Sequence, residues 1–166
     1  MNAFDSINSD DPPAIPADKL DEMRQAIELL FFAYRDFTAE PDSILARYDF
    51  GRAHHRVIYF VGADAGMSVS DLLAILKITK QSLSRVLGQL LREGFIEQQT
   101  DTQDRRRRLL FLTPKGQELE TLLTDKQTSL IAKAYRDSGA EAVAGFATVL
   151  RGIISDVDQK RFVESE

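Results

Sequence analysis

The sequence predicts a mainly helical protein that carries a single short two-stranded hairpin. Apolar residues recur at three- and four-residue spacing in several segments, which is typical of amphipathic helices. The spacing changes to a strand-like pattern around residues 95–112, and glycine or proline stands near most transitions. The chain of 166 residues, 43% of them apolar, suits one domain with an added helical layer.

The first fifty residues predict an acidic arm followed by a helix. Residues 1–18 hold four aspartates, three prolines and no base, so we expect a flexible arm. Residues 19–50 are predicted to form an N-terminal helix and a linker. Asp18 is the expected N-cap, the helix runs to about Thr38, and Glu40-Pro41-Asp42 ends it before a short helical piece at 43–48. The apolar stripe of this helix is Leu20, Met23, Ile27, Leu30, Phe31 and Tyr34.

Residues 51–113 predict a winged helix-turn-helix. A helix ending near Gly62 is followed by a second that Ser68 and Asp71 cap, and by a third that Gly94 stops. Strands are then expected at 95–99 and 107–112, with a polar loop at 100–106 between them. The third helix buries the stripe Leu83, Val86, Leu87, Leu90 and Leu91.

Residues 114–166 predict two long helices. Thr113-Pro114 places a capping residue before a proline, so a helix is expected to start there and to break at Asp137-Ser138-Gly139. A last helix is expected to carry apolar residues from Val143 to Val157. The terminal helices offer more apolar surface than a small winged domain readily buries. They either pack on each other within one chain or pair across a two-fold axis.

The charge of the chain is unevenly distributed. The whole chain carries a net charge of −5, but residues 77–108 carry eight bases and four acids, which leaves that window at +4 and the other 134 residues at −9. A binding surface depends on local clustering of charge and not on the net value. The cluster either forms an ordinary solvated face or binds a polyanion.

The third helix of the winged region is the candidate recognition helix. The side opposite its apolar stripe shows Lys80, Gln81, Ser82, Ser84, Arg85 and Gln89, and no acid occurs from Lys77 to Arg92. Arginine can bond guanine with two hydrogen bonds, and glutamine can do the same with adenine. We therefore predict that this face contacts bases of double-stranded DNA. The alternative is an ordinary surface helix.

The hairpin tip supplies an independent argument for DNA. Arg105, Arg106 and Arg107 are the candidate contacts, because guanidiniums on a narrow loop can reach phosphates or enter a minor groove. Asp104 is expected to hold a neighbouring arginine in place. The alternative is a charged tip that serves only solubility.

The winged region resembles the MarR-type regulators. The resemblance covers about residues 20–160, and its specific part is Asp101-Thr-Gln-Asp-Arg-Arg followed by Leu112-Thr-Pro-Lys-Gly. The generic part consists of Arg52-Ala-His-His-Arg-Val-Ile, Ser68-Val-Ser-Asp-Leu-Leu-Ala-Ile-Leu, Ile78-Thr-Lys-Gln-Ser-Leu-Ser-Arg-Val-Leu and Leu91-Arg-Glu-Gly-Phe-Ile-Glu. The chain departs from the family pattern at Gln81, where a small serine is common, and at Arg107, where a small or apolar residue is frequent.

The resemblance implies roles for individual residues. It implies that Arg106 enters the minor groove, that Asp104 bonds wing arginines, and that Ser68 meets a phosphate. It also implies a homodimer built from the terminal helices, which binds a near-palindromic operator as a repressor. A small-molecule effector would bind a pocket whose candidate residues are Phe31, Tyr34, His55 and Tyr59. Each of these four is alternatively a plain core aromatic.

Other functions find little support in the sequence. The chain has no Cys, so disulfides, thiol sensing and Cys-containing zinc sites are excluded. His54 and His55 are adjacent and point about 100° apart on a helix, so we expect no metal and no cofactor. The sequence shows no catalytic motif, membrane-length apolar run or signal peptide, so we expect a cytoplasmic, nucleoid-associated protein and not an enzyme. The alternative function is a winged-helix adaptor that binds proteins and no DNA.

Overall fold

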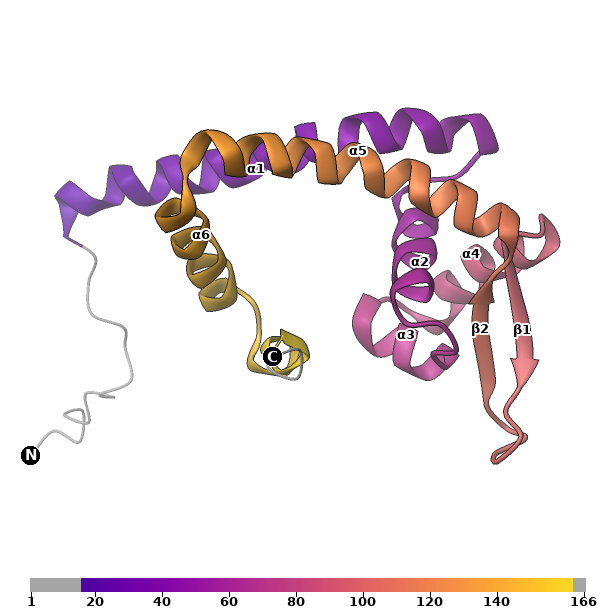
Figure 1. The fold of residues 1–166 in the computed structure, drawn as a ribbon. Coiled ribbons are helices and arrows are strands. Elements are labelled where there is room, and N and C mark those ends of the chain that lie inside the picture. Colours follow the sequence, from indigo (N-terminus) through magenta and orange to yellow (C-terminus); the bar gives the residue numbers. More distant parts are fainter. Residues whose placement is uncertain (1–15, 163–166) are drawn as a thin grey trace, which may run out of the picture. The chain divides into compact units, whose positions relative to one another are not determined.

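The computed structural model describes residues 16–162, so most of the predicted arm at 1–18 lies outside the described residues. The described chain divides into two compact units, and the boundary between Asp36 and Phe37 falls inside the first helix, α1 (Ala17–Leu45). This helix begins one residue before Asp18, the expected N-cap. Figure 1 shows the order of the elements along the chain. The prediction of a mainly helical fold with one hairpin is confirmed.

The predicted end of the first helix at Glu40-Pro41-Asp42 is wrong, because α1 continues to Leu45. Proline lacks the N–H that would bond the carbonyl oxygen four residues earlier, which belongs to Phe37. Gln127 Nε2, on α5 (Pro114–Ser138), donates to that oxygen at 3.4 Å. The side chain of Pro41 is also fully buried. A replacement donor and burial therefore let the helix pass through the proline. A 3₁₀ turn, η1 (Ala46–Tyr48), follows.

Three helices and the hairpin form most of the core of the second unit, and the end of α1 and the first half of α5 add Leu45, Leu119 and Leu123. The three helices are α2 (Arg52–Ala63), α3 (Val69–Leu76) and α4 (Lys80–Arg92), and the sequence predicted each of them. Gly94, with a φ of +74°, follows α4 as expected. The fully buried side chains of this core include Val57, Ile58, Val61, Leu72, Leu83, Leu90, Phe95, Ile96 and Leu110. The apolar stripes that the three- and four-residue spacing predicts therefore pack into this core and stabilise the helix-turn-helix.

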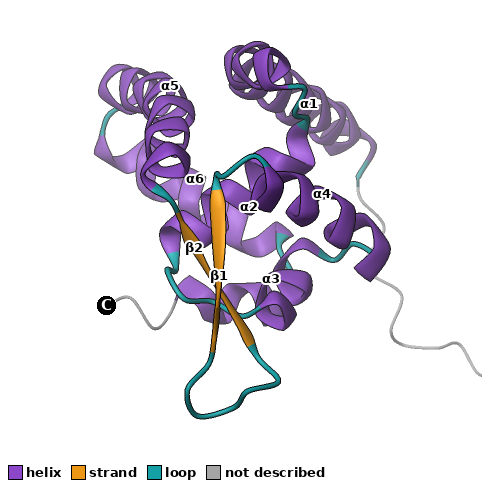
Figure 2. Ribbon diagram, turned by 90° about the vertical axis from the view of Figure 1, so that its right-hand side faces the viewer, coloured by secondary structure: helices purple, strands orange, loops and turns teal. Residues whose placement is uncertain are grey.

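The hairpin pairs β1 (Ile96–Thr100) with β2 (Arg108–Leu112) in antiparallel register, from Ile96 opposite Leu112 to Thr100 opposite Arg108. The segment before α3 also pairs with β2 through backbone hydrogen bonds. Gly66 N donates to Leu110 O at 2.8 Å, and Leu110 N donates to Met67 O at 2.9 Å. Figure 2 shows the loop between β1 and β2 projecting beyond α3. The hairpin is therefore anchored at its base and extended at its tip.

The start of α5 is joined closely to the end of α4. Thr113 caps α5 by accepting from Gly116 N at 3.1 Å, as its sequence predicts. The same hydroxyl donates to Gly94 O at 2.6 Å, and Lys115 Nζ donates to Glu93 O at 2.9 Å. A Cβ at Gly116 would collide with the backbone oxygen of Phe95. Two helix ends thus share one set of contacts, which we call the α4–α5 junction (Glu93–Phe95 and Thr113–Gly116).

The C-terminal part contains two helices where the sequence predicts one after Gly139. Gly139, with a φ of +83°, ends α5 as expected. However, α6 (Ala140–Ile153) stops before Val157, and Ser155 caps a new short helix, α7 (Asp156–Gln159). A final turn, η2 (Lys160–Phe162), follows. Lys77 Nζ lies 2.6 Å from Asp158 Oδ2, which fixes α7 to the turn between α3 and α4. No helix in the described part of the chain is long and apolar enough to cross a membrane.

Candidate nucleic-acid interface

Helix α4 presents a polar, acid-free face to solvent. Thr79 caps it by accepting from Ser82 N at 3.1 Å, and the residues of its first turn are exposed. Its polar residues Lys80, Gln81, Ser82, Ser84 and Arg85 are all exposed, and Gln81, Ser82, Ser84 and Arg85 line one hollow of the surface. The side chains that the sequence predicts for base contact therefore lie together and outward. Such a face can donate hydrogen bonds to base edges and phosphates.

Gln89 is the exception on this helix. Its Oε1 lies 2.9 Å from His54 Nε2 on α2, and its Nε2 donates to Glu93 Oε1 at 2.9 Å. His54 Nδ1 accepts from Gly51 N at 3.1 Å, so its Nε2 carries the hydrogen and donates to Gln89. Gln89 therefore links α4 to α2, and the prediction that its side chain belongs to the outward face is wrong.

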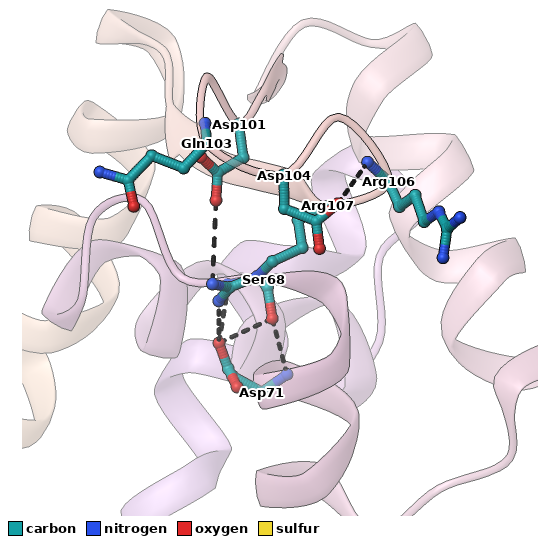
Figure 3. A network of polar contacts seen from close by, with 7 residues as sticks. All are labelled: Ser68, Asp71, Asp101, Gln103, Asp104, Arg106 and Arg107. Carbon is teal, nitrogen blue, oxygen red and sulfur yellow. Dashed lines mark hydrogen bonds and ion pairs between the residues drawn. The ribbon is translucent and has the colours of Figure 1, made fainter.

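The loop at the tip of the hairpin is shaped by two aspartates (Figure 3). Asp101 Oδ1 accepts from Gln103 N at 2.8 Å, and Asp104 Oδ1 accepts from Arg106 N at 3.0 Å. The Asp104 carbonyl also accepts from Arg107 N at 2.9 Å. Asp104 thus fixes the loop through backbone N–H groups. Its carboxylate pairs with no guanidinium in the described part of the chain. It therefore holds the backbone of Arg106 and not the side chain of a neighbouring arginine.

The four consecutive arginines divide into two pairs. Arg107 lies with Nη2 3.5 Å from Asp71 Oδ2 and Nη1 3.8 Å from Asp101 Oδ2. Arg108 Nη1 donates to Thr100 Oγ1 at 2.9 Å and to Arg105 O at 3.2 Å. The guanidiniums of Arg105 and Arg106 are exposed and make no hydrogen bond or ion pair within residues 16–162. Figure 3 shows the Arg106 side chain pointing away from the carboxylates.

Ser68 occupies a structural position. Its side chain is 3% exposed, its Oγ accepts from Asp71 N at 3.1 Å and donates to Asp71 Oδ2 at 2.6 Å. Asp71 Oδ2 in turn accepts from Ser68 N at 3.1 Å, which completes the predicted capping box. The hydrogen bond from the Ser68 hydroxyl is the main reason that the pKa of Asp71 lies below its usual range; burial opposes this shift, while the Ser68 N–H and, least of all, the charge of Arg107 add to it. A buried hydroxyl engaged in this way is not available to a phosphate.

The four candidate pocket residues belong to different parts of α1 and α2. Phe31 and Tyr34 are exposed on the part of α1 in the first unit, and His55 and Tyr59 lie one turn apart on α2 in the second. His55 is half-buried, and this burial lowers its pKa, while Asp42 and Glu120 oppose the shift. Among the described residues, no group of three His, Cys, Asp or Glu side chains could hold a metal ion.

Sequence reasoning missed two residues of this interface. The sequence indicates Asp71 only as a helix cap and Asp101 only as part of a motif, yet both pair with Arg107. No local spacing rule links residue 71 to residue 107, because they meet only after the hairpin has folded back onto α3. The one signal in the sequence was the arginine at 107 itself, in a run of four arginines that follows two aspartates.

A capped, acid-free helix in a helix-turn-helix, followed by a hairpin with outward arginines, defines the class of winged helix-turn-helix proteins. A family model described as MarR family matches residues 48–107. The HTH-type transcriptional regulator PetP of Rhodobacter capsulatus is 44% identical over 142 residues, which are 86% of each chain. The chain belongs to the MarR family. This is a family of transcription regulators and not of enzymes, as the sequence predicts.

Solved structures show the same fold. The crystal structure of Streptococcus pneumoniae FabT in complex with DNA matches with a TM-score of 0.68 and 22% identity, over 86% of this chain and 97% of that one. A mutant MarR from E. coli complexed with operator DNA matches with a TM-score of 0.62 and 19% identity, over 81% and 97% of the two chains.

Proposed function

We propose that the chain binds a specific double-stranded DNA operator as a homodimer and represses transcription by occupying a promoter. The observation that carries the proposal is a pair of outward surfaces on a chain of net charge −5: the acid-free face of α4, and the wing-tip arginines Arg105 and Arg106, which are unpaired within the described residues. In this proposal Gln81, Ser84 and Arg85 read base edges, Lys80 and Ser82 contact the backbone, and Arg105 and Arg106 enter or line the minor groove.

The dimer is supported by apolar side chains that one chain leaves exposed. Ile27 is 69% exposed, Phe31 63%, Val149 64% and Ile153 62%. Exposed apolar surface of this extent on helices is typical of an interface. We propose that residues 19–50 and 114–166 form the dimerisation layer and that residues 51–113 form the DNA-binding domain. A two-fold dimer presents its recognition helices about 34 Å apart, so the operator is a near-palindrome.

The comparisons support DNA as the ligand and leave the effector as a proposal. PetP is named a transcriptional regulator, and the FabT and MarR structures contain DNA. We propose further that a small phenolic or lipophilic effector binds the protein and releases the DNA. We also propose that the protein acts in the cytoplasm, at the nucleoid, where a DNA-binding regulator meets its operator.

The test is a binding titration on promoter-derived palindromic DNA over a range of salt concentrations. Contacts to phosphates release counterions, so the affinity should fall steeply as salt rises, and it should fall strongly when the palindrome is scrambled. An affinity that is independent of salt or of sequence would contradict the proposal. A stoichiometric protein partner, together with no DNA binding at low salt, would favour the adaptor function instead.

A further inference from the structure

We propose that Arg107 is a positioning residue: it braces the wing against α3 and so sets the place from which Arg105 and Arg106 reach DNA. This inference rests on the proposed function. The side chain of Arg107 joins two elements, because it lies between Asp71 of α3 and Asp101 of the wing loop. In Figure 3 the loop, Arg107 and the capping box of α3 form one network.

The wing needs a brace beyond its base. Backbone hydrogen bonds tie β2 to the segment before α3 only at Leu110, and the bridge between Ser68 and Leu109 lies next to them. A two-stranded hairpin has little stability of its own in water. The loop at 101–107 lies beyond these backbone hydrogen bonds. Arg107 is the last residue of the loop and directly precedes β2. Within the described residues Arg108 contacts only the wing itself, at Thr100 and Arg105, whereas the contact of Arg107 with Asp71 ties the loop to α3.

Both carboxylates that face Arg107 are themselves held. Asp71 Oδ2 accepts from Ser68 N at 3.1 Å and from Ser68 Oγ at 2.6 Å. The Asp101 side chain is 15% exposed, its Oδ1 accepts from Gln103 N at 2.8 Å, and its own N–H donates to Arg107 O at 3.2 Å. A planar guanidinium can reach two carboxylates on different elements at once, which a lysine ammonium does less well.

The charges around Arg107 argue against a direct DNA contact. Two carboxylates offset its positive charge, whereas Arg105 and Arg106 have no such partner within the described residues. The Arg107 and Asp71 side chains are 50% and 56% exposed, so their ion pair adds little to global stability. Its effect should therefore appear in the position of the wing and not in the folding of the domain.

Asp71→Asn distinguishes the positioning role from a general effect of charge, because the two predict opposite changes in the affinity for DNA. Asparagine keeps an oxygen that accepts from Ser68 N and removes the charge that holds Arg107. Removing an acid beside a DNA-binding surface should by charge alone tighten binding. Loss of the brace should weaken it, by about threefold or more. The measurement is the dissociation constant of the full chain on the promoter-derived palindrome.

Glu97→Gln is the matched control. Glu97 is an exposed acid on β1 whose Oε1 accepts from Gln99 Nε2 at 3.2 Å, and glutamine keeps that acceptor. We expect unchanged or tighter binding for Glu97→Gln and weaker binding for Asp71→Asn. If Asp71→Asn tightens binding as Glu97→Gln does, the brace is refuted.

Substitutions of the arginines supply a second readout, the salt dependence of binding. Arg106→Ala removes a proposed DNA contact, so the slope of log affinity against log salt should shrink by about one contact. Arg107→Lys keeps the positive charge and loses the planar guanidinium that reaches two carboxylates. The affinity for DNA should therefore fall about threefold, while the slope against log salt stays the same. A lysine variant with full affinity, or an Arg107→Ala variant with a reduced slope, would make Arg107 a DNA contact and overturn the proposal.

Amide hydrogen exchange without DNA makes the inference independent of operator binding. In Asp71→Asn the amides of residues 101–107 should exchange faster than in the unmodified chain, while those of α2 and α5 stay unchanged. Unaltered exchange in the loop would refute the brace. If the unmodified chain binds no DNA, the proposed function fails, and the exchange result still decides whether Arg107 holds the wing.

Discussion

Arg105, Arg106, Arg107 and Arg108 are identical side chains at consecutive positions, but their surroundings differ. Two of them pair with the protein's own carboxylates, hydroxyl and carbonyl, and two extend into solvent. The sequence predicted three of them as DNA contacts by their position in a charged loop. The two groups of arginines differ in their ion pairs and hydrogen bonds. These contacts depend on Asp71 and Thr100, which lie on other elements. A run of one residue type therefore does not define one role.

Arg85 carries the clearest prediction at the residue scale. Its side chain is exposed on the polar face of α4 and lines the surface hollow with Gln81, Ser82 and Ser84. Arg85→Ala should weaken binding to the operator by about 1–3 kcal/mol and relax the preference at one base pair of each half-site. Binding selection on randomised operators, with a thermal melt as a folding control, measures both effects. Equal losses on all sequences would instead make Arg85 a phosphate contact.

His55 predicts a pH dependence of stability. Burial lowers its pKa below the ordinary value of 6.5, with Asp42 and Glu120 opposing the shift and Arg56 assisting it. The unfolded chain therefore binds this proton at a higher pH than the folded chain does. The stability that the neutral, half-buried imidazole of His55 contributes is present above pH 6.5. It is lost as the pH falls toward and through the folded-state pKa.

The measurement compares the free energy of unfolding of the unmodified chain and of His55→Gln, by urea denaturation at about pH 7.5 and about pH 5.5. The unmodified chain should lose more stability between the two pH values than the variant does. Identical losses in the two proteins would show that His55 does not titrate in this range.

At the scale of elements, the sequence predicted those boundaries that local chemistry sets. Ser68 with Asp71, Thr113 with Pro114, and Gly139 mark helix ends through bonds or backbone angles of neighbouring residues. The continuation of α1 through Pro41 could not be predicted, because it depends on Gln127, which is distant in sequence. The break after Ile153 was missed because Val157 still fits the helical spacing of Val143 to Ile153.

Gly116 gives the sharpest test of an element contact. Any Cβ there would meet the Phe95 carbonyl, a backbone atom that cannot rotate away. Gly116→Ala should therefore lower the free energy of unfolding by about 2 kcal/mol or more. Gly145→Ala on α6 is the matched control, because a Cβ there meets nothing within 4 Å and glycine disfavours a helix interior. Urea denaturation should find the control as stable as the unmodified chain or more so, and equal losses would contradict the contact.

The whole molecule is organised by the separation of its charges and of its apolar surfaces. The bases of residues 77–108 stand on a chain that is otherwise acidic, so the net charge of −5 hides a surface suited to DNA. The family assignment agrees with the fold and with this local surface. The terminal helices leave apolar side chains exposed that a single chain does not cover.

Ile27→Glu tests the dimer at this scale. Ile27 is 69% exposed, so the substitution should leave the helix of one chain intact. A charge in an apolar interface costs several kcal/mol of association, so sedimentation equilibrium should shift from dimer to monomer. Binding to the full palindrome should fall with it. Gln25→Glu adds the same charge on an exposed position of the same helix and should leave the dimer unchanged. Two variants with the same mass would contradict the predicted interface.

The α4–α5 junction has a mechanical consequence for the molecule. The carbonyls that end α4 receive hydrogen bonds from Thr113 and Lys115, and Gly116 lies against the Phe95 backbone with no side chain between them. Because α5 cannot tilt at its first turn without breaking these bonds, a rotation of α5 carries the end of α4 along. We therefore expect α5 and the end of α4 to turn together, as one rigid unit.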